Sequence, residues 1–295
     1  MWADIRFVCS RGILNSCTVH SSRPVSSCGT DKAYLDSMVL AEGGSIYVCS
    51  ELLSYFVDSI LPKISVEFYL VTGDSDLTMP KDGLQPTQFT RLIDNRHLRK
   101  WFCQNTPVQD HSKIVQLPIG LDYHTVAANP QHKWIMNGEG AMPAEQEKVL
   151  ESIRSAAAPF HERLPKVFVN FGTFDKFGDR RSAIMAIPTD LMTLRNQAPR
   201  TLVWKFIAKH AFVLSPFGNG MDCHRTWEAL ILGAIPIVRG HQFDAMFTDL
   251  PVLIVDSWED VTELKLATTI EEFKKREFNY RKLELSYWTE QFCSK

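Results

Sequence analysis

Apolar runs rich in β-branched residues alternate along the chain with longer stretches of helical spacing, a pattern typical of α/β proteins. In the first half, helical spacing predicts helices over Leu52–Leu61, which Pro62 ends, and over Leu98–Cys103. The strands predicted in this half are Ile5–Cys9, Ser45–Val48, Glu67–Thr72 and Lys113–Leu117.

A second series of elements begins after residues 127–144, a stretch rich in Asn, Gln, Gly and Pro that we interpret as a linker. Glu145–Ala158 is predicted to be a helix. The strands predicted after it are Lys166–Phe171, Ala211–Leu214, Ile235–Val238 and Val252–Val255. Two α/β halves joined near residue 145 predict a cleft, and parallel sheets bind ligands beyond the carboxyl ends of their strands. Residues 73–76 and 215–220 are predicted to lie at such ends.

Composition and charge narrow the class of protein. The chain has 295 residues, of which 45% are hydrophobic, and a formal net charge of -2 with scattered Lys and Arg, which disfavours a nucleic-acid partner. Seven cysteines without a CxxC pair indicate free thiols in a reducing compartment. No apolar run reaches the length of a membrane span, and Asp4 and Arg6 interrupt the first apolar stretch, unlike a signal peptide. We therefore expect a cytoplasmic protein.

The most informative segment is residues 211–238. A strand is predicted to end at Leu214, and a loop with two glycines leads to a helix that begins near Asp222 as its N-cap. Gly218 and Gly220 have no Cβ, so the backbone there can come close to a ligand. The N-terminus of the helix would offer free N–H groups and a partial positive charge to a diphosphate.

Three polar residues lie in the first turns of this predicted helix. Arg225 and Glu228 are three apart and share a face, as do His224 and Glu228 at four. A cation beside a phosphate and a carboxylate that accepts ribose hydroxyls is the chemistry a nucleotide sugar needs. A surface ion pair after an ordinary glycine turn would show the same spacing, so spacing alone leaves both interpretations open.

The run SPFGNGMDCHRTWEALILGAIPIV, 24 residues from Ser215 to Val238, resembles the signature of exostosin-like glycosyltransferases. That family, which includes short forms from microbes and large algal viruses, shows SP-x-GNG-x-D-x-HR-x-WEAL followed by G-x-IPIV. Weaker likeness extends over most of the chain, in the segments ELLSYFVDSILPKISVEFYLVTGDSD, KWFCQN, KIVQLPIGLDYH and PVLIVDSWEDVTE.

The resemblance implies an α/β fold of the GT-B type, with two Rossmann-like domains facing across a cleft. Residues 1–145 would bind the acceptor and residues 146–275 the nucleotide sugar, while a helix in 276–295 would pack back on the first domain. Glu228 would hold the ribose, and Arg225 with the amides of Gly218–Gly220 would contact the diphosphate. The secondary candidates for donor binding are Ser215, Asn219 and His224.

An inverting transfer needs a base on the first domain, within hydrogen-bond reach of the acceptor hydroxyl. Asp74 and Asp76 follow a predicted strand and are both candidates, and simple capping of the next segment is the alternative for both. Family members often have His-Asn-Ser-Asp at these positions, which aligns Asp76 with the family's acid. Arg180 and Arg181 are placed to stabilise the leaving diphosphate, or else form a solvated helix start.

The expected reaction moves a sugar from a UDP-sugar to an oligosaccharide or glycoprotein glycan. The resemblance to the viral forms implies UDP-xylose as the donor. No cofactor or metal is expected. Residues 74–76 do fit the Asp-x-Asp motif, which holds a metal in other glycosyltransferases. In the family picture the turn at Pro118–His124 lines the cleft, through Asp122, Tyr123 or His124. A non-catalytic nucleotide-sugar or glycan-binding protein is the alternative. A dinucleotide-dependent oxidoreductase is disfavoured because no GxGxxG follows Ile5–Cys9.

Overall fold

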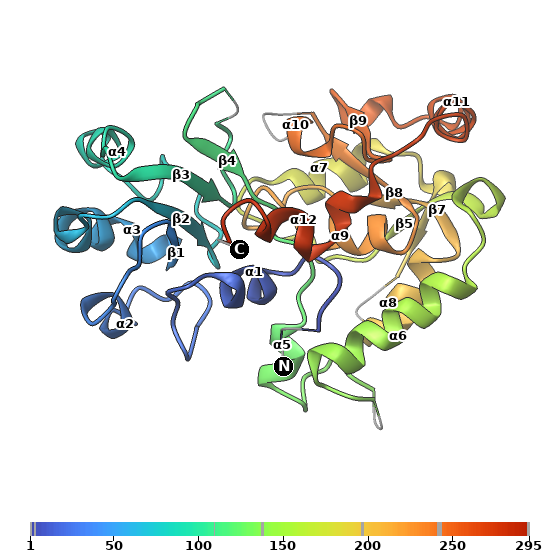
Figure 1. Cartoon of the computed structure of the whole chain (residues 1–295). Coiled ribbons are helices and arrows are strands. Elements are labelled where there is room, and N and C mark those ends of the chain that lie inside the picture. The colour runs from blue at the N-terminus through green and yellow to red at the C-terminus, as the bar shows by residue number, and fades with distance from the viewer. Residues whose placement is uncertain are drawn as a thin grey trace.

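The computed structural model describes residues 2, 4–108, 110–136, 139–195, 198–240 and 244–293. This part of the chain forms two sheets, a four-stranded one of order β1-β2-β3-β4 and a five-stranded one of order β6-β5-β7-β8-β9. All neighbouring strands in both sheets are parallel, so the prediction of an α/β protein with two parallel-sheet halves is confirmed. Figure 1 shows the two halves side by side.

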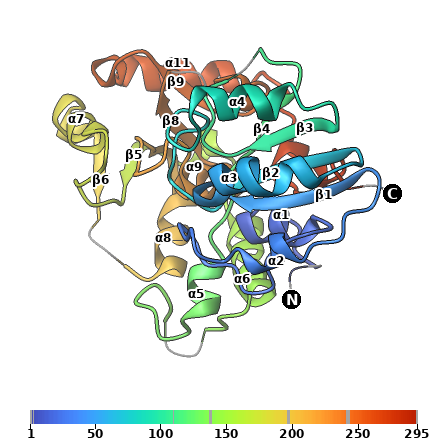
Figure 2. The ribbon, with the colours of Figure 1, turned by 90° about the vertical axis from the view of Figure 1, so that its left-hand side faces the viewer.

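The first half is built on β1 to β4. In Figure 2 the molecule is turned so that this half faces the viewer. Helical turns run from Ser50 to Lys63, where the sequence predicts a helix. Its strands are β1 (Gly44–Cys49), β2 (Phe68–Gly73), β3 (Leu98–Cys103) and β4 (Ile114–Gln116). Its helices are α1 (Ser10–Ser16), α2 (Ala33–Asp36), α3 (Leu53–Tyr55) and α4 (Pro86–Ile93).

Two predicted elements of this half are wrong. Leu98–Cys103 is strand β3 and not a helix, because Trp101 pairs with Leu70 on one side and Ile114 on the other, inside the sheet. Six residues are too few for apolar periodicity to separate a helix from a strand buried on both faces. Ile5–Cys9 forms only isolated bridges, Phe7 with Glu284 and Cys9 with Gly120 and Leu121.

The second half contains strand β6, which the hydrophobic pattern does not predict. Its strands are β5 (Leu164–Val169), β6 (Met192–Leu194), β7 (His210–Leu214), β8 (Ile235–Arg239) and β9 (Leu253–Val255). Its helices are α6 (Pro143–Ala156), α7 (Asp179–Ala186), α8 (Arg200–Ile207), α9 (His224–Ile231), α10 (Asp244–Phe247) and α11 (Glu263–Phe273). Two further helices are α5 (His124–Ala128), which precedes α6, and α12 (Leu285–Thr289), the last described helix.

In the central parts of strands such as β2 and β5, successive side chains enter different hydrophobic cores, as the pleat requires. Val71 and Phe102 of the first sheet share one core with Phe168 and Val213 of the second. The opposite faces of the two sheets have separate cores, one under each sheet. A continuous apolar layer therefore joins the two halves.

The end of the chain returns to the first half. The amide of Leu285 donates to the carbonyl of Arg6, and the ring of Phe292 lies 5.1 Å from that of Phe102 on β3. Phe278 packs instead on Phe273 of α11. Within the predicted linker 127–144, Asn137 and Gly138 lie outside the described residues, and so do residues 294–295 of the predicted final segment.

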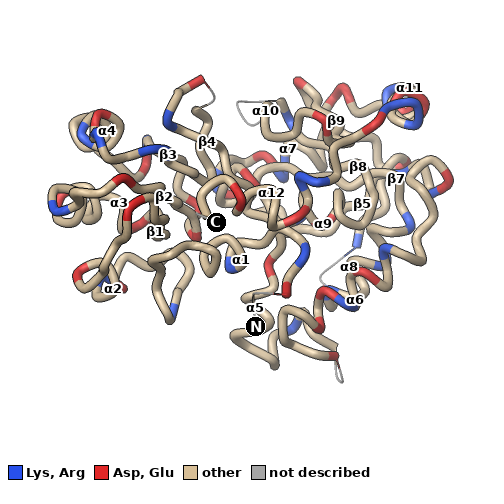
Figure 3. The backbone as a smooth tube through the Cα atoms, in the orientation of Figure 1, with Lys and Arg blue, Asp and Glu red and all other residues tan. Residues whose placement is uncertain are grey.

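Charges are mixed over both halves, with basic and acidic residues interspersed along the backbone tube in Figure 3. All seven cysteines lie in the described part of the chain, and each is a free thiol, as their number and spacing predict. Among the described helices, none has both the length and the apolar character needed to cross a bilayer.

Candidate active site

A pocket of about 740 Å³ lies where the carboxyl ends of strands from both sheets meet. Asp76 follows β2, Ile119 and Asp122 follow β4, and Trp134 lies in the predicted linker, so these four lining residues come from residues 1–145. The loops after β5 and β7 and the first turns of α9 line the opposite wall. This is the position in which parallel sheets bind ligands.

The loop between β7 and α9 contains the glycines that the sequence singles out. A Cβ on Gly218 would lie 3.1 Å from Nη2 of Arg180, and one on Gly220 would lie 3.0 Å from Nδ2 of Asn105, so both positions have little room for a side chain. The amide of Gly218 donates to the carbonyl of Gly220 at 3.0 Å and is thus used within the loop. The amides of Asn219 and Gly220 make no such bond to another described residue, and both residues line the pocket.

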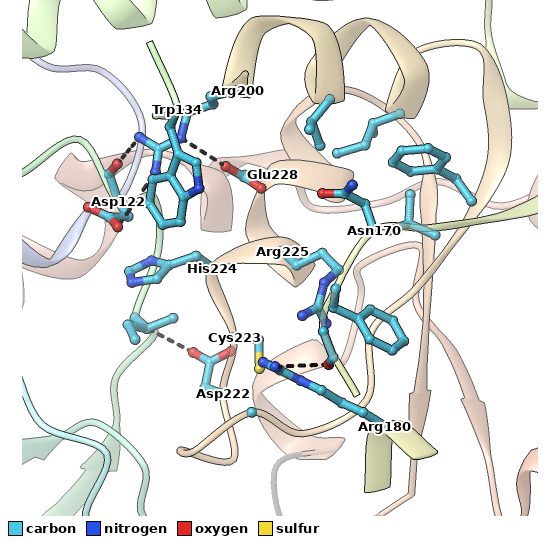
Figure 4. Close-up of a pocket in the computed structure, with 18 of the residues that line it drawn as sticks. Asp122, Trp134, Asn170, Arg180, Arg200, Asp222, Cys223, His224, Arg225 and Glu228 are labelled. Atoms are coloured by element: carbon cyan, nitrogen blue, oxygen red, sulfur yellow. Dashed lines mark hydrogen bonds and ion pairs between the residues drawn. The ribbon is translucent and has the colours of Figure 1, made fainter. Parts of the chain in front are cut away.

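Arg225 and Arg180 bring two positive charges into the pocket beside this loop, as Figure 4 shows. The guanidinium of Arg225 lies 4.6 Å from the ring centre of Phe171 and donates to the carbonyl of Pro216 at 3.4 Å. Arg180 donates to the carbonyl of Phe174 at 3.0 Å, and its buried Nε has no partner among the described residues. Burial lowers the pKa of Arg225, and the nearby Arg180 contributes to this.

No described carboxylate forms an ion pair with either arginine. Their hydrogen bonds go to backbone carbonyls and, for Arg225, to the hydroxyl of Ser215 at 3.5 Å. Two partly desolvated guanidinium groups without an ion-paired carboxylate favour binding of an anion, and a diphosphate has the fork-like oxygens that guanidinium groups recognise.

Glu228 lies one turn further along α9, at the other end of the pocket. Its Oε1 accepts from Nε1 of Trp204 at 3.0 Å and lies 3.8 Å from Nε of Arg200. The guanidinium of Arg200 stacks on Trp134 at 4.6 Å and lies 3.5 Å from the carboxylate of Asp122. Sequence reasoning missed Arg200, Trp204 and Trp134, because these residues lie outside the motif and reach it only through the packing of α8.

Asp222 is not the N-cap that the sequence predicts. Cys223 occupies that position, and no side chain caps the helix. The carboxylate of Asp222 instead accepts from the amide of Ile119 at 2.7 Å and from the indole of Trp227 at 3.0 Å, while its own amide donates to Asn105 at 3.0 Å. Burial raises the pKa of Asp222 to about 6, against the effect of these hydrogen bonds. Asp222 therefore links the loop between β7 and α9 to the first half.

His224 lines the pocket beside the turn that follows β4. Its Nδ1 lies 2.7 Å from the carbonyl of Gly120, which can only accept, so Nδ1 carries the proton and donates it. Nδ1 of His124 lies 3.1 Å from Asp122. Burial alone would raise the pKa of Asp122, but the positive charges of His224, His124 and Arg200 hold it below its ordinary value.

Of the three residues predicted to line the cleft after Pro118, Asp122 lies in the wall of the pocket. Tyr123 and His124 do not belong to this wall. The hydroxyl of Tyr123 donates to Glu147 at 2.9 Å.

The structure separates the two candidates for the base. Asp76 is exposed and lines the pocket. Asp74 does not line it: its carboxylate forms a buried ion pair with Arg11 and accepts from the hydroxyl of Ser26 at 2.8 Å. An Asp-x-Asp metal site would therefore compete with Arg11 for Asp74.

Two other predicted donor-binding residues lie outside the pocket. The hydroxyl of Ser215 is buried behind the glycine loop, 2.8 Å from that of Thr226. Arg181 is exposed on α7 and borders a separate surface hollow. The predicted donor-binding residues that the fold brings together in the pocket are Arg180, Gly218, Asn219, Gly220, His224, Arg225 and Glu228.

Comparison with known proteins adds a distant structural likeness. No known protein family and no curated protein sequence matches the chain. Among solved structures, it is similar to AviGT4, a glycosyltransferase involved in avilamycin A biosynthesis, with 13% identity over 82% of this chain and 88% of that chain and a TM-score of 0.30. A likeness at that TM-score decides neither fold nor function, and the resemblance to exostosin-like enzymes stays a prediction.

Proposed function

We propose that this protein is a glycosyltransferase that takes its sugar from a UDP-sugar and works in a GT-B-type arrangement of its two halves. The observation that carries the proposal is that two arginines without an ion pair to a described carboxylate, Arg180 and Arg225, line the pocket together with the carboxylate of Glu228. This wall lies beside the carboxyl ends of β5 and β7, where a nucleotide binds in parallel sheets.

In this proposal the arginines bind the diphosphate, together with the free amides of Asn219 and Gly220 and the N-terminus of α9. The ribose then lies against Glu228, whose carboxylate accepts hydrogen bonds from the ribose hydroxyls. When the bond between the sugar and the β-phosphate breaks, its electron pair leaves with UDP, and the arginines stabilise the added negative charge. Arginine charge fills the role that a metal ion has in other transferases, so we propose that catalysis needs no metal.

We propose Asp76 as the base, because it is the exposed carboxylate that the strand ends of the first half bring to the pocket. The acceptor hydroxyl attacks the anomeric carbon on the face opposite the diphosphate, its proton passes to Asp76, and the configuration inverts. Asp74 would position the loop through its ion pair with Arg11.

The acceptor is proposed to be a glycan that enters from the first half. UDP-xylose is the donor that the resemblance to viral enzymes favours, and the pocket itself does not distinguish it from other UDP-sugars.

The test is a screen of UDP-sugars and other nucleotide sugars by calorimetry, followed by a hydrolysis and transfer assay with the donors that bind. We expect a UDP-sugar to bind and to release UDP. Asp76→Asn should keep donor affinity and lose at least about a hundredfold in kcat, a typical loss when a general base is removed.

Asp74→Asn serves as the matched variant, with the same chemical change two residues away. If it abolishes transfer while Asp76→Asn does not, the assignment of the base is wrong. Binding of a UDP-sugar without turnover for any glycan acceptor would instead favour a non-catalytic nucleotide-sugar-binding protein. Absence of binding for all nucleotide sugars would refute the proposal as a whole.

A further inference from the structure

The two carboxylate oxygens of Glu228 have different surroundings. Oε1 accepts from the indole of Trp204 at 3.0 Å and lies 3.8 Å from Nε of Arg200. Oε2 accepts no hydrogen bond from another described residue. The side chain is 14% exposed and borders the pocket, so one oxygen is held while the other is left for a ligand.

The groups that hold Oε1 are themselves fixed. Trp204 is 2% exposed and belongs to the core that joins the two halves. The guanidinium of Arg200 stacks on Trp134 and donates to Gln146 at 3.2 Å and to the backbone carbonyl of Asp122. Because neither donor can follow a turning carboxylate, the plane of the Glu228 carboxylate is set before any ligand arrives.

We propose that Trp204 and Arg200 are positioning residues that fix Glu228 so that Oε2 faces the ribose hydroxyls, and that this makes the site select ribonucleotides. The inference rests on the proposed function, in which Glu228 holds the ribose. Without Trp204, Oε1 loses its neutral donor, and the carboxylate can turn into a two-point pair with the fork of Arg200, only 3.8 Å away. Both oxygens are then occupied, and a ribose hydroxyl finds no acceptor.

The experiment compares the affinities of UDP and 2′,3′-dideoxy-UDP by calorimetry. The second ligand keeps the base and the diphosphate but lacks both ribose hydroxyls, so the ratio of the two affinities reports Glu228 alone. We expect the wild-type protein to prefer UDP by roughly ten- to a hundredfold, the range for hydrogen bonds to a charged acceptor. In Trp204→Phe the ratio should fall to within about threefold of one, with the affinity for dideoxy-UDP unchanged.

Trp101→Phe is the matched control. Its indole also donates a buried hydrogen bond, to the hydroxyl of Thr72 at 2.8 Å, but inside the first sheet and away from the pocket. This variant should keep the wild-type ratio. In a Glu228→Gln background, Trp204→Phe should cause no further change of the ratio, because Trp204 acts through the carboxylate.

If Trp204→Phe does not fold, Arg200→Lys gives the same test, because a lysine cannot reproduce the planar guanidinium that holds Oε1. A wild-type ratio in either variant, or an equal weakening of both ligands, overturns the inference and leaves the proposed function standing. A wild-type protein that binds neither UDP nor any other nucleoside diphosphate refutes the proposed function itself.

Discussion

Replacement of Arg225 by methionine tests the anion site most directly. Methionine has a similar length and can still pack on Phe171, so the variant removes the charge and leaves most of the volume. A charge-assisted hydrogen bond to phosphate contributes about 1.5 to 3 kcal/mol. The dissociation constant for UDP should therefore rise by roughly ten- to 150-fold.

The same substitution should act in the opposite direction on the stability of the free protein. Burial lowers the pKa of Arg225 despite the opposing attraction of Glu228, which means that the folded state holds this charge at a net cost in solvation. Replacing an unpaired buried charge by an apolar side chain is neutral or stabilising, so the free energy of unfolding should stay constant or rise by up to about 2 kcal/mol. Weaker binding together with undiminished stability would be hard to explain by damage to the fold.

The assays are calorimetric titration with UDP and urea unfolding, both at one fixed salt concentration. Arg276→Met is the control, because Arg276 also lies over a phenyl ring, that of Phe273 at 5.3 Å, but is exposed and outside the pocket. An affinity of Arg225→Met within about threefold of wild type, or an equal loss in Arg276→Met, would refute the assignment of Arg225 to the diphosphate.

Three further predictions concern other residues of the pocket. Because the pKa of Asp222 rises from 3.8 to about 6 on folding, its contribution to stability is complete below pH about 4 and is lost as the pH rises through about 6. In Asp222→Asn, the free energy of unfolding in urea should therefore depend less on pH between pH 4 and 7 than in the wild type. Gly218→Ala should displace Arg180, 3.1 Å from the new Cβ, and weaken UDP binding about tenfold in calorimetry, with little effect on the melting temperature. Transfer in the presence of EDTA should match transfer without it, and a loss restored by a divalent cation would contradict a reaction supported by arginines.

Local signals account for the elements that could be predicted. The segment 211–238 contains clear boundary signals: a buried apolar run, two glycines and a second apolar run. It folds as β7, α9 and β8. Strand β6 has only three residues at the edge of its sheet, too few for any periodicity. The six residues of strand β3 are too few for apolar periodicity to exclude a helix, and pairing on both sides decides its conformation.

The site shows the same division. His224, Arg225 and Glu228 share one helix, so spacing predicts that they act together, and the structure places all three at the pocket. The partners of Glu228, Arg200 and Trp204, lie on a different helix, α8, and no local sequence pattern connects them to Glu228. Asp74 and Asp76 follow the same strand, so the local pattern leaves both open, and the tertiary contacts of Asp74 with Arg11 and Ser26 distinguish them.

A chain of hydrogen bonds connects the loop between β7 and α9 to the segment that contains the proposed base, Asp76. Asn105, with a left-handed φ of 51° that asparagine tolerates, donates from Nδ2 to the carbonyl of Ser75 at 3.0 Å and accepts on Oδ1 from the amide of Asp222 at 3.0 Å. Ser75 precedes Asp76, and Asp222 precedes the first turn of α9, which holds Arg225. Because a single amide side chain bridges both loops, the distance from the base to the diphosphate is set by the folded core and not by the ligand. An in-line displacement depends on that distance, since about 1 Å of misplacement can cost a hundredfold in rate.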